Sequence, residues 1–338
     1  MPSFPEMTDP ETIYADLARL GLIRPGDRPP AAPLTGGVSS DIWKVDLPPG
    51  PVAVKRALAK LKVAQDWRAP VGRSRYEIRW FRTVARIIPE AVPQIVAADE
   101  EAGVFAMSYL DPAGHPLWKR QLLDGHVEVG TAEEVGRRLA LIHSATARDK
   151  SIPGLFPTDA IFHDIRLSPY LEAAAAKHPD RADALHRIVE TTATTRRALV
   201  HGDVSPKNIL VGPSGPIFLD AECAWFGDPA FDLGFCLNHL LLKCLVRREA
   251  AAPLLASFEA MGRRYLAGVD WEPAADIEAR AAVLLPGLLL ARVDGKSPVE
   301  YLTDDADKSL VRRVARHLLD QPVARLALVA DRWTQELR

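Results

Sequence analysis

Cysteine is scarce in this sequence: three residues, Cys223, Cys236 and Cys244, stand among 338. An odd number of thiols cannot all pair with one another, and none of the three belongs to a CxxC spacing. Structural zinc sites are typically built from such closely spaced cysteines. The sequence therefore argues against a structural zinc site, and we expect a protein of the reducing cytoplasm.

An excess of one charge is also missing. The chain has 42 Lys and Arg residues against 44 Asp and Glu, for a formal net charge of −2. Nucleic-acid-binding proteins normally show a clustered basic excess, so we expect no nucleic-acid partner. Hydrophobic residues make up 48% of the chain, which is enough to offset the entropy of ordering and excludes a disordered chain. The length suits two domains, or one unit of two lobes.

Long apolar runs are absent as well. Residues 1–14 lack the positive and apolar regions of a signal peptide. The two most apolar stretches are Phe235–Val246, which polar residues interrupt, and Ala281–Ala291, which contains Pro286. The second is too short to span a bilayer core of about 30 Å. We therefore expect two buried helices and no membrane partner.

Strand-like runs dominate the sequence from Leu34 to Leu110. Short β-rich segments bounded by Gly, Pro or acidic residues predict strands. They are Ile42–Leu47, Val52–Lys55, Gln94–Ala98 and Val104–Met107. Between them, apolar residues at helical spacing predict a helix over Arg73–Ile87.

Helical patterns dominate after Leu110. The predicted helices are Thr131–His143, Pro169–Lys177, Asp180–Arg197, Phe231–Arg248, Ala252–Ala267, Ala274–Ala291 and Asp305–Leu319, and one strand-like island, Ala198–Asp220, interrupts them. We thus expect three segments. Residues 1–33 hold a short helix, starting at Asp9-Pro10, and a proline-rich lead-in. Residues 34–107 form a β-rich N-lobe, and residues 108–338 form a helical C-lobe, with a hinge at about 107–111.

The most informative motif lies in the strand-like island. It reads His201-Gly-Asp203-Val-Ser-Pro-Lys-Asn208, and a second apolar run ends at Asp220, twelve residues later. Phosphoryl transfer needs one carboxylate at the acceptor hydroxyl, and an amide and a second carboxylate on the metal ions that neutralise the phosphates. Two hairpin-linked strands would place Asp203, Asn208 and Asp220 around one point. The alternative is a chance string of turn residues between two strands.

This HGDxxxxN…D pattern resembles the aminoglycoside phosphotransferase and choline kinase superfamily, small-molecule kinases related to protein kinases. The segment from Asp220 to Asp232 resembles that family's continuation, and the resemblance covers about residues 34–235. It implies an α+β, bilobal, protein-kinase-like fold with a small antiparallel-sheet N-lobe and a larger, mainly helical C-lobe. It also implies ATP and Mg²⁺ as cofactors, Asp203 as the catalytic residue, and Asn208 and Asp220 as metal ligands. The expected partner is a small hydroxylated acceptor, and the expected assembly is a monomer or homodimer.

A strand that ends in lysine precedes this motif. In Val52-Ala-Val-Lys55, the lysine has the position of the kinase residue that contacts the nucleotide phosphates. Its expected partner is Glu77 on the following helix. The alternative is a surface ion pair of Glu77 with Arg73 or Arg79.

A glycine-containing turn lies upstream of Lys55, with Gly36, Gly37, Ser39 and Ser40. Paired glycines let the backbone approach phosphate closely, and serines add hydrogen-bond donors. We expect these four residues to contact the nucleotide, although the full GxGxxG of protein kinases is missing. An ordinary turn between strands is the alternative.

The end of the last predicted N-lobe strand, Met107-Ser108-Tyr-Leu110, is the expected hinge. The resemblance implies that the backbones of Ser108 and Leu110 hydrogen-bond the adenine edge. Met107 would line the pocket behind it.

Four polar residues near the motif have further expected roles. The resemblance implies that Asp232 braces the catalytic loop through its backbone, and His201 is expected to be a packed, structural histidine. Lys207 either approaches the γ-phosphate or is a solvated turn lysine. Glu222 either supports a second magnesium ion or caps a turn.

A polar island at residues 292–301 follows the apolar Ala281–Ala291 segment. Asp294, Lys296 and Glu300 are its candidates for lining the acceptor site, and an ordinary loop between helices is the alternative. The balanced charges of this island do not form the acidic pocket that a polycationic aminoglycoside needs.

Together, these motifs predict an ATP-dependent phosphotransferase that moves the γ-phosphate to a hydroxyl of a small metabolite such as an amino alcohol, sugar or polyol. An aminoglycoside antibiotic O-phosphotransferase is the first alternative, and a catalytically idle nucleotide-binding pseudokinase is the second. A protein kinase is disfavoured, because HGD replaces HRD and no APE-type segment follows Asp220.

Overall fold

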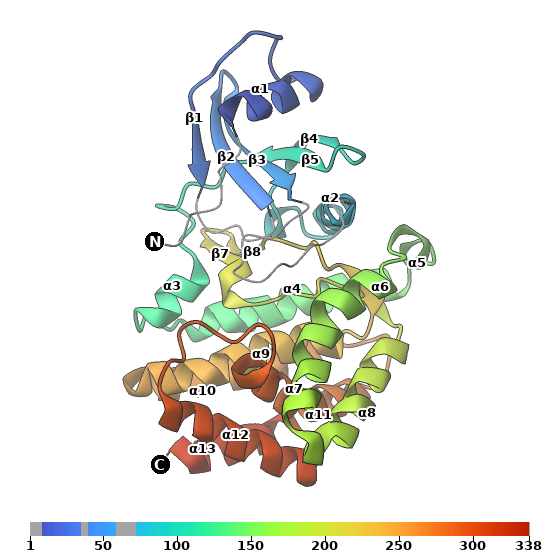
Figure 1. Cartoon of the computed structure of the whole chain (residues 1–338), viewed down its shortest axis with the longest axis vertical. Coiled ribbons are helices and arrows are strands. Elements are labelled where there is room, and N and C mark those ends of the chain that lie inside the picture. Colours follow the sequence, from blue (N-terminus) through green and yellow to red (C-terminus); the bar gives the residue numbers. More distant parts are fainter. Residues whose placement is uncertain (1–8, 35–39, 59–71, 338) are drawn as a thin grey trace. The chain divides into compact units, whose positions relative to one another are not determined.

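The computed structural model describes residues 9–34, 40–58 and 72–337. They separate into two compact units, the first ending at Asp111 and the second beginning at Pro112. Figure 1 shows a sheet with helices in the first unit and mostly helices in the second. The α+β class expected from the sequence, with an antiparallel sheet first and a helical part after it, is confirmed.

The first unit is built on an antiparallel sheet with the strand order β1-β2-β3-β5-β4. Its strands are β1 (Ala31–Leu34), β2 (Ser40–Leu47), β3 (Gly50–Ala57), β4 (Ile95–Asp99) and β5 (Val104–Ser108). The four predicted strands are therefore present, each within a few residues of its expected bounds. Strand β1 was missed because its sequence, AAPL, belongs to the proline-rich lead-in. A proline is tolerated there because β1 is an edge strand.

Helix α1 (Pro10–Arg19) packs on this sheet. The carboxylate of Asp9 accepts a hydrogen bond from the Glu11 amide at 3.0 Å, which confirms the predicted N-cap. Ile13 and Leu17 are fully buried in a core cluster with Trp43 and other sheet residues. The helix is thus held to the sheet by its apolar face.

The second helix of this unit, α2 (Arg73–Ala85), follows its predicted range closely, and a short 3₁₀ turn, η1 (Pro89–Ala91), comes after it. Ile78, Phe81 and Val84 are buried, as their helical spacing predicts. The ring of Phe81 packs edge-on against Phe105 of β5, with the centroids 6.2 Å apart. This packing fixes α2 against the sheet.

The second unit is mainly helical (Figure 1). Its helices are α3 (Trp118–Leu123), α4 (Val129–Ala147), α5 (Ile152–Leu155), α6 (Asp159–Phe162), α7 (Ala173–Lys177), α8 (Ala182–Thr194), α9 (Ala230–Val246), α10 (Ala251–Leu266), α11 (Ala274–Asp294), α12 (Asp305–Asp320) and α13 (Leu326–Leu337). Short 3₁₀ turns are η3 (Pro179–Arg181), η4 (Pro206–Asn208) and η5 (Arg248–Ala250). Helices α4 and α10 pack closely at Gly136 of α4, which has no side chain. A Cβ at this position would lie 2.4 Å from the carbonyl oxygen of Met261.

The helix predicted from Pro169 begins earlier in the structure. A π-helical segment, η2 (His163–Glu172), contains Pro169 and continues directly into α7. Proline at the first helical position is the usual start signal, which explains the prediction. Here Pro169 lies inside the segment, where the wider π turn accommodates a residue that lacks an amide hydrogen.

Four short strands carry the island of the sequence motif. They are β6 (Ala198–Val200), β7 (Ile209–Gly212), β8 (Gly215–Phe218) and β9 (Trp225–Gly227). Strand β6 pairs with β9, and β7 pairs with β8 as a hairpin, both antiparallel. The connections between these strands hold the motif residues.

The two most apolar stretches of the sequence lie in α9 and α11, which are largely buried in the second unit. Within the described part of the chain, we find no helix with the length and apolar character needed to cross a membrane.

Candidate active site

The loop after β6 turns sharply at Gly202. Its φ is +80°, in the left-handed region that favours glycine. A Cβ at this position would lie 2.6 Å from the carbonyl oxygen of Cys223. The glycine of the HGD motif is therefore required twice, for its backbone conformation and for its close approach to residue 223.

Asp232 of α9 fixes this loop by hydrogen bonds to its backbone. Its fully buried carboxylate accepts hydrogen bonds from the amides of His201, at 2.7 Å, and Gly202, at 2.8 Å. The Nε2 atom of His143 lies 3.3 Å from the same carboxylate. The bracing contact expected for Asp232 is thus present.

His201 is a packed histidine within the loop. Its Nδ1 accepts a hydrogen bond from the Asp203 amide at 3.1 Å, and its Nε2 lies 3.0 Å from the carbonyl oxygen of Leu219. These partners require a proton on Nε2 and none on Nδ1. Burial lowers the pKa of His201, which agrees with a neutral ring. The ring ties the loop to the end of β8.

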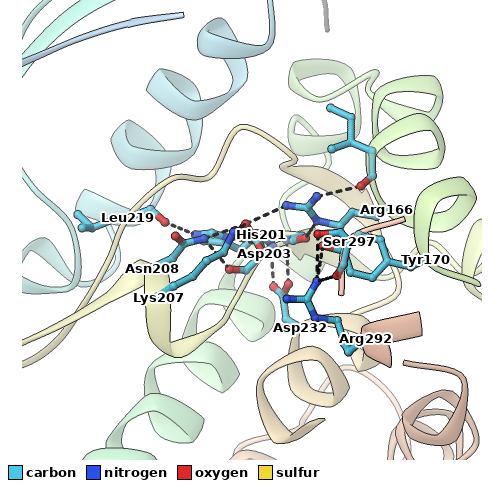
Figure 2. Close-up of polar contacts among 12 residues, drawn as sticks. Arg166, Tyr170, His201, Asp203, Lys207, Asn208, Leu219, Asp232, Arg292 and Ser297 are labelled. Atoms are coloured by element: carbon cyan, nitrogen blue, oxygen red, sulfur yellow. Dashed lines mark hydrogen bonds and ion pairs between the residues drawn. The ribbon is translucent and has the colours of Figure 1, made fainter. Parts of the chain in front are cut away.

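The Asp203 carboxylate is buried, and its two oxygens have different surroundings (Figure 2). Oδ2 lies 2.9 Å from Arg166 Nη2, 3.0 Å from Lys207 Nζ and 2.9 Å from Asn208 Nδ2. Oδ1 is buried and has no hydrogen-bond partner among the described residues. One oxygen is therefore fixed by three donors, and the other is left for a further donor.

The charge on Asp203 follows from these contacts. Burial alone would raise the pKa of this carboxyl group, but the positive charges of Arg166 and Lys207 outweigh that effect and lower it. The carboxylate is consequently ionised at neutral pH. Lys207 is 46% exposed and also pairs with Asp203, so it is both solvated and part of the site.

Arg166 of η2 is the residue that sequence reasoning missed. Its guanidinium is buried and also donates to the carbonyl oxygens of Gly202 and of the preceding residue, Ile165. Figure 2 shows Arg166 on one side of Asp203, with Lys207 and Asn208 on the other. Its signal was an isolated arginine between two apolar residues. That signal was lost because the helix was predicted to begin only at Pro169.

Asn208 and Asp220 have features that suit a metal ion. Nδ2 of Asn208 donates to both the carbonyl oxygen and the carboxylate of Asp203. These bonds use the amide nitrogen and leave the amide oxygen of Asn208 for another ligand. Asp220 has a φ of +65°, the only positive value of a non-glycine residue in the described ranges. Such backbone conformations cluster at functional sites. The charge of Asp220 raises the pKa of Asp203, so the two carboxylates are neighbours.

Two oxygen donors suit a magnesium ion that substrate phosphates also bind, and they are too few for a metal site made of protein ligands alone. Residues 9–34, 40–58 and 72–337 contain no group of three or more His, Cys, Asp or Glu side chains that would hold a metal alone. Magnesium is commonly bound by one or two side-chain oxygens together with substrate phosphates. Glu222 is half-buried two residues after Asp220, and its role stays a prediction.

The first unit contains the expected lysine–glutamate pair. Lys55 Nζ of β3 lies 2.7 Å from Glu77 Oε1 of α2, and both side chains are at most 5% exposed. Lysine side chains are rarely buried, so the burial of Lys55 next to a carboxylate is unusual. Glu77 is therefore part of a buried ion pair with Lys55, as expected.

The sequence matches the model of a known protein family. The model of APH, the phosphotransferase enzyme family, matches residues 30–267, which is well over half of the sequence. This chain belongs to the phosphotransferase enzyme family. The match includes the Lys55–Glu77 pair, the HGD loop and Asp232, and so confirms the family resemblance.

The individual proteins that this family member resembles have low sequence identity to it. Methylthioribose kinase from Escherichia coli O45:K1 is 27% identical over 228 residues, which are 58% of this chain and 53% of that protein. The chain thus spans about half the length of that curated relative. The solved ethanolamine kinase of Plasmodium vivax has a TM-score of 0.58 at 11% identity, covering 96% of this chain and 94% of the other. An amicoumacin kinase, hAmiN, solved with AMP-PNP, Ca²⁺ and Ami, has a TM-score of 0.53 at 13% identity over 94% and 95%. Both structures show a shared fold.

The glycine-containing turn and the hinge are less completely described in this family member. Gly36, Gly37 and Ser39 lie outside the described residues, and Ser40 is buried at the start of β2. Met107 is buried in β5.

The Ser108 amide donates to the carbonyl oxygen of Gln94 at 2.8 Å, so this amide already has a partner. Of the expected adenine contacts, the Ser108 carbonyl and the Leu110 backbone therefore remain predictions.

The polar island at the end of α11 is mostly engaged in its own contacts. Asp294 lies 2.7 Å from Arg312 and 2.9 Å from His178 Nε2. Glu300 pairs with Lys119, and Lys296 is exposed. These contacts favour the structural alternative for Asp294, an ordinary brace between helices.

Proposed function

We propose that this protein is a kinase that transfers the γ-phosphate of ATP to a hydroxyl group of a small molecule. The observation that carries the proposal is the Asp203 carboxylate, with Oδ2 held by three donors and Oδ1 buried without a partner among the described residues. A buried polar atom without a partner is rare and calls for a missing group. A hydroxyl donor is the group that a phosphotransferase needs at this position.

The proposed role of Asp203 follows from its charge. Because its pKa is lowered, the carboxylate is ready to accept a hydrogen bond at Oδ1 from the acceptor hydroxyl. The acceptor oxygen then forms a bond to the γ-phosphorus, the bond from that phosphorus to the bridging oxygen breaks, and ADP leaves. The hydroxyl proton passes to Oδ1.

Asn208 and Asp220 would hold magnesium in this proposal, through the amide oxygen and the carboxylate. When bound, the ion neutralises charge on the phosphates. Lys55, held by Glu77, would contact the nucleotide phosphates, and the segment 107–110 would bind the adenine. The names of the relatives support ATP as the phosphate donor, since they include three small-molecule kinases, one of them solved with an ATP analogue.

The idle-pseudokinase alternative has less support. Asp203 is buried, is paired with Arg166 and Lys207 and accepts a hydrogen bond from Asn208, and this is an arrangement that catalysis can use directly.

Phosphate transfer itself tests the proposal. Purified protein is incubated with ATP labelled at the γ-phosphate, Mg²⁺ and a panel of alcohols, amino alcohols, sugars and sugar acids. We expect label in one class of acceptor, none without Mg²⁺, and none with Asp203→Asn. Label appearing only in inorganic phosphate with every compound, and equally with Asp203→Asn, would contradict the proposal.

A further inference from the structure

Two arginines share one aromatic ring beside Asp203. The Arg166 guanidinium lies 5.7 Å from the ring centre of Tyr170, and the Arg292 guanidinium lies 5.4 Å from the same centre. Arg292 comes from α11 and also donates to the Tyr170 hydroxyl at 3.2 Å. In Figure 2, Arg166, Tyr170 and Arg292 lie on the same side of Asp203. Arg292 is thus linked to the candidate catalytic carboxylate through a short series of contacts.

A second series of contacts leads from Arg166 to a buried lysine of α9. Arg166 lies 5.9 Å from the ring of Phe235, which lies 5.7 Å from the ring of His239. His239 Nδ1 is 2.9 Å from the Tyr301 hydroxyl, and Lys243 Nζ lies 4.4 Å from the Tyr301 ring. Aromatic rings therefore separate the positive charges without neutralising them.

Neither Arg292 nor Lys243 has a carboxylate partner among the described residues. Arg292 donates only to the Tyr170 hydroxyl and to the carbonyl and hydroxyl oxygens of Ser297, and its buried Nε has no partner there. The nearby Glu300 is already paired with Lys119. Both cations are at most 7% exposed. Buried charges normally carry a counter-ion, and the described residues do not supply one.

The titration of this region reflects the surplus of positive charge. Burial, together with the charges of Lys119 and Arg292, lowers the pKa of Lys243 to about 7. Burial and four neighbouring cations lower the pKa of His239 well below its usual value. The neutral ring leaves a buried Nε2 atom with no partner within the described ranges.

We propose that the acceptor is an anionic hydroxy compound, whose hydroxyl reaches Asp203 and whose carboxylate or phosphate group is bound by Arg292, with Lys243 behind it. This inference rests on the kinase function proposed above and names its substrate class. A bound anion supplies the missing counter-charge and an acceptor for Arg292. A cationic acceptor, such as an amino sugar with several ammonium groups, is repelled by the same residues.

Matched sets of compounds test the charge requirement. The sets are glycerol, glycerate and glycerol 3-phosphate, and ribose, ribonate and ribose 5-phosphate, with choline and kanamycin as cationic probes. Binding is measured as the rise in melting temperature in the presence of Mg²⁺ and a non-hydrolysable ATP analogue, and turnover as ADP release. We expect the anionic members alone to raise the Tm, with the carboxylate and phosphate arms showing which anion is preferred.

Two variants locate the anion site. Arg292→Met should raise the KM, or the binding constant, of the best anionic probe about 10- to 100-fold, as for a lost hydrogen bond to a charged group, and leave the KM for ATP unchanged. Lys243→Met should act in the same direction and should fold, because replacing an unpaired buried charge by an apolar side chain is tolerated. The exposed residues Arg313 and Lys177, changed to Met, are the matched controls and should bind the probe normally.

The outcomes separate this inference from the kinase function. Stabilisation by anionic probes that Lys243→Met or Arg292→Met removes supports the anion site, even if no probe yields ADP. Turnover of a neutral or cationic probe at least equal to that of its anionic counterpart overturns the inference and leaves the kinase function intact. A panel in which no anionic member raises the Tm also overturns it.

Discussion

Replacement of Arg166 by methionine should damage catalysis and shift its pH dependence. Arg166 is buried, lies 2.9 Å from Asp203 and donates to the carbonyl oxygen of Gly202, so it holds both the carboxylate and its loop. A misplacement of about 1 Å at a reacting group costs about 10²-fold in rate. We therefore expect kcat to fall about 10²-fold while the KM for ATP changes little.

The pH profile separates this positioning role from a loss of stability. In the native site, Arg166 and Lys207 outweigh the effect of burial and lower the pKa of Asp203. Without Arg166, one of the two positive charges that oppose the effect of burial is lost, so the pKa of Asp203 rises. Since the ionised carboxylate is the active form, the acid limb of kcat should move to higher pH. Arg166→Lys, which keeps the charge but not the fork of donors, should restore part of the limb.

The same change should also lower stability. Removing one partner of a buried ion pair typically costs about 3–5 kcal/mol, because a charge is left buried. Lys207 and Asn208 still contact Asp203, so we expect the lower end, which is roughly a 6–12 °C drop in Tm for a unit of this size. The loss should be much smaller in an Asp203→Asn background. It should also shrink as the pH is lowered, because the raised pKa lets Asp203 become neutral.

Arg280→Met is the matched control for this experiment. Arg280 also pairs with a buried aspartate, Asp228, and with Glu272, but neither of these ion pairs involves Asp203. Its loss should lower stability but leave the acid limb of kcat where it was. An Arg166→Met enzyme with native kcat and an unmoved acid limb would refute the positioning role.

Three further substitutions have expected outcomes. Gly202→Ala should destabilise the protein by several kcal/mol, because the φ of Gly202 is +80° and a Cβ there would lie 2.6 Å from the carbonyl oxygen of Cys223. Gly130→Ala is the control, since a Cβ at Gly130 meets nothing within 4 Å. Equal melting temperatures of the two variants would show this reasoning to be wrong. Asp220→Ala should abolish the rise in Tm that Mg²⁺-ATP gives to the native protein, and a retained shift would remove Asp220 from the metal site. Asp294→Asn should lower the Tm through the loss of its contacts with Arg312 and His178 and leave acceptor kinetics unchanged, and a raised acceptor KM would instead place it in the acceptor site.

Much of the fold could be predicted because local signals agree with the tertiary structure. Strands β2 to β5, the capped start of α1 and the apolar spacing of α2 could all be predicted from neighbouring residues. Strand β1 and segment η2 were not, because proline was taken as a lead-in or a helix start. In both places, the position of the proline at a sheet edge or in a π turn depends on contacts distant in sequence.

The site was predictable where one segment contains the chemistry and hidden where several elements meet. The HGD loop, Asn208 and Asp220 fall within twenty residues, so their spacing carries a signal. Arg166, Lys243 and Arg292 come from η2, α9 and α11, and nothing in the sequence brings them together. Asp294 and Glu300 were candidates because they lie in a polar island, but ion pairs with Arg312 and Lys119 already engage them.

The rate of phosphate transfer by Asp203→Asn tests the central claim most directly. The best acceptor from the panel is used at saturating Mg²⁺-ATP, and the exposed Asp331, changed to Asn, is the control. We expect Asp203→Asn to lose about 10²–10⁴-fold in kcat, to keep the rise in Tm with Mg²⁺-ATP, and Asp331→Asn to match the native enzyme. A kcat of Asp203→Asn within a few-fold of native would contradict the assignment of this carboxylate as the group that accepts the hydroxyl proton.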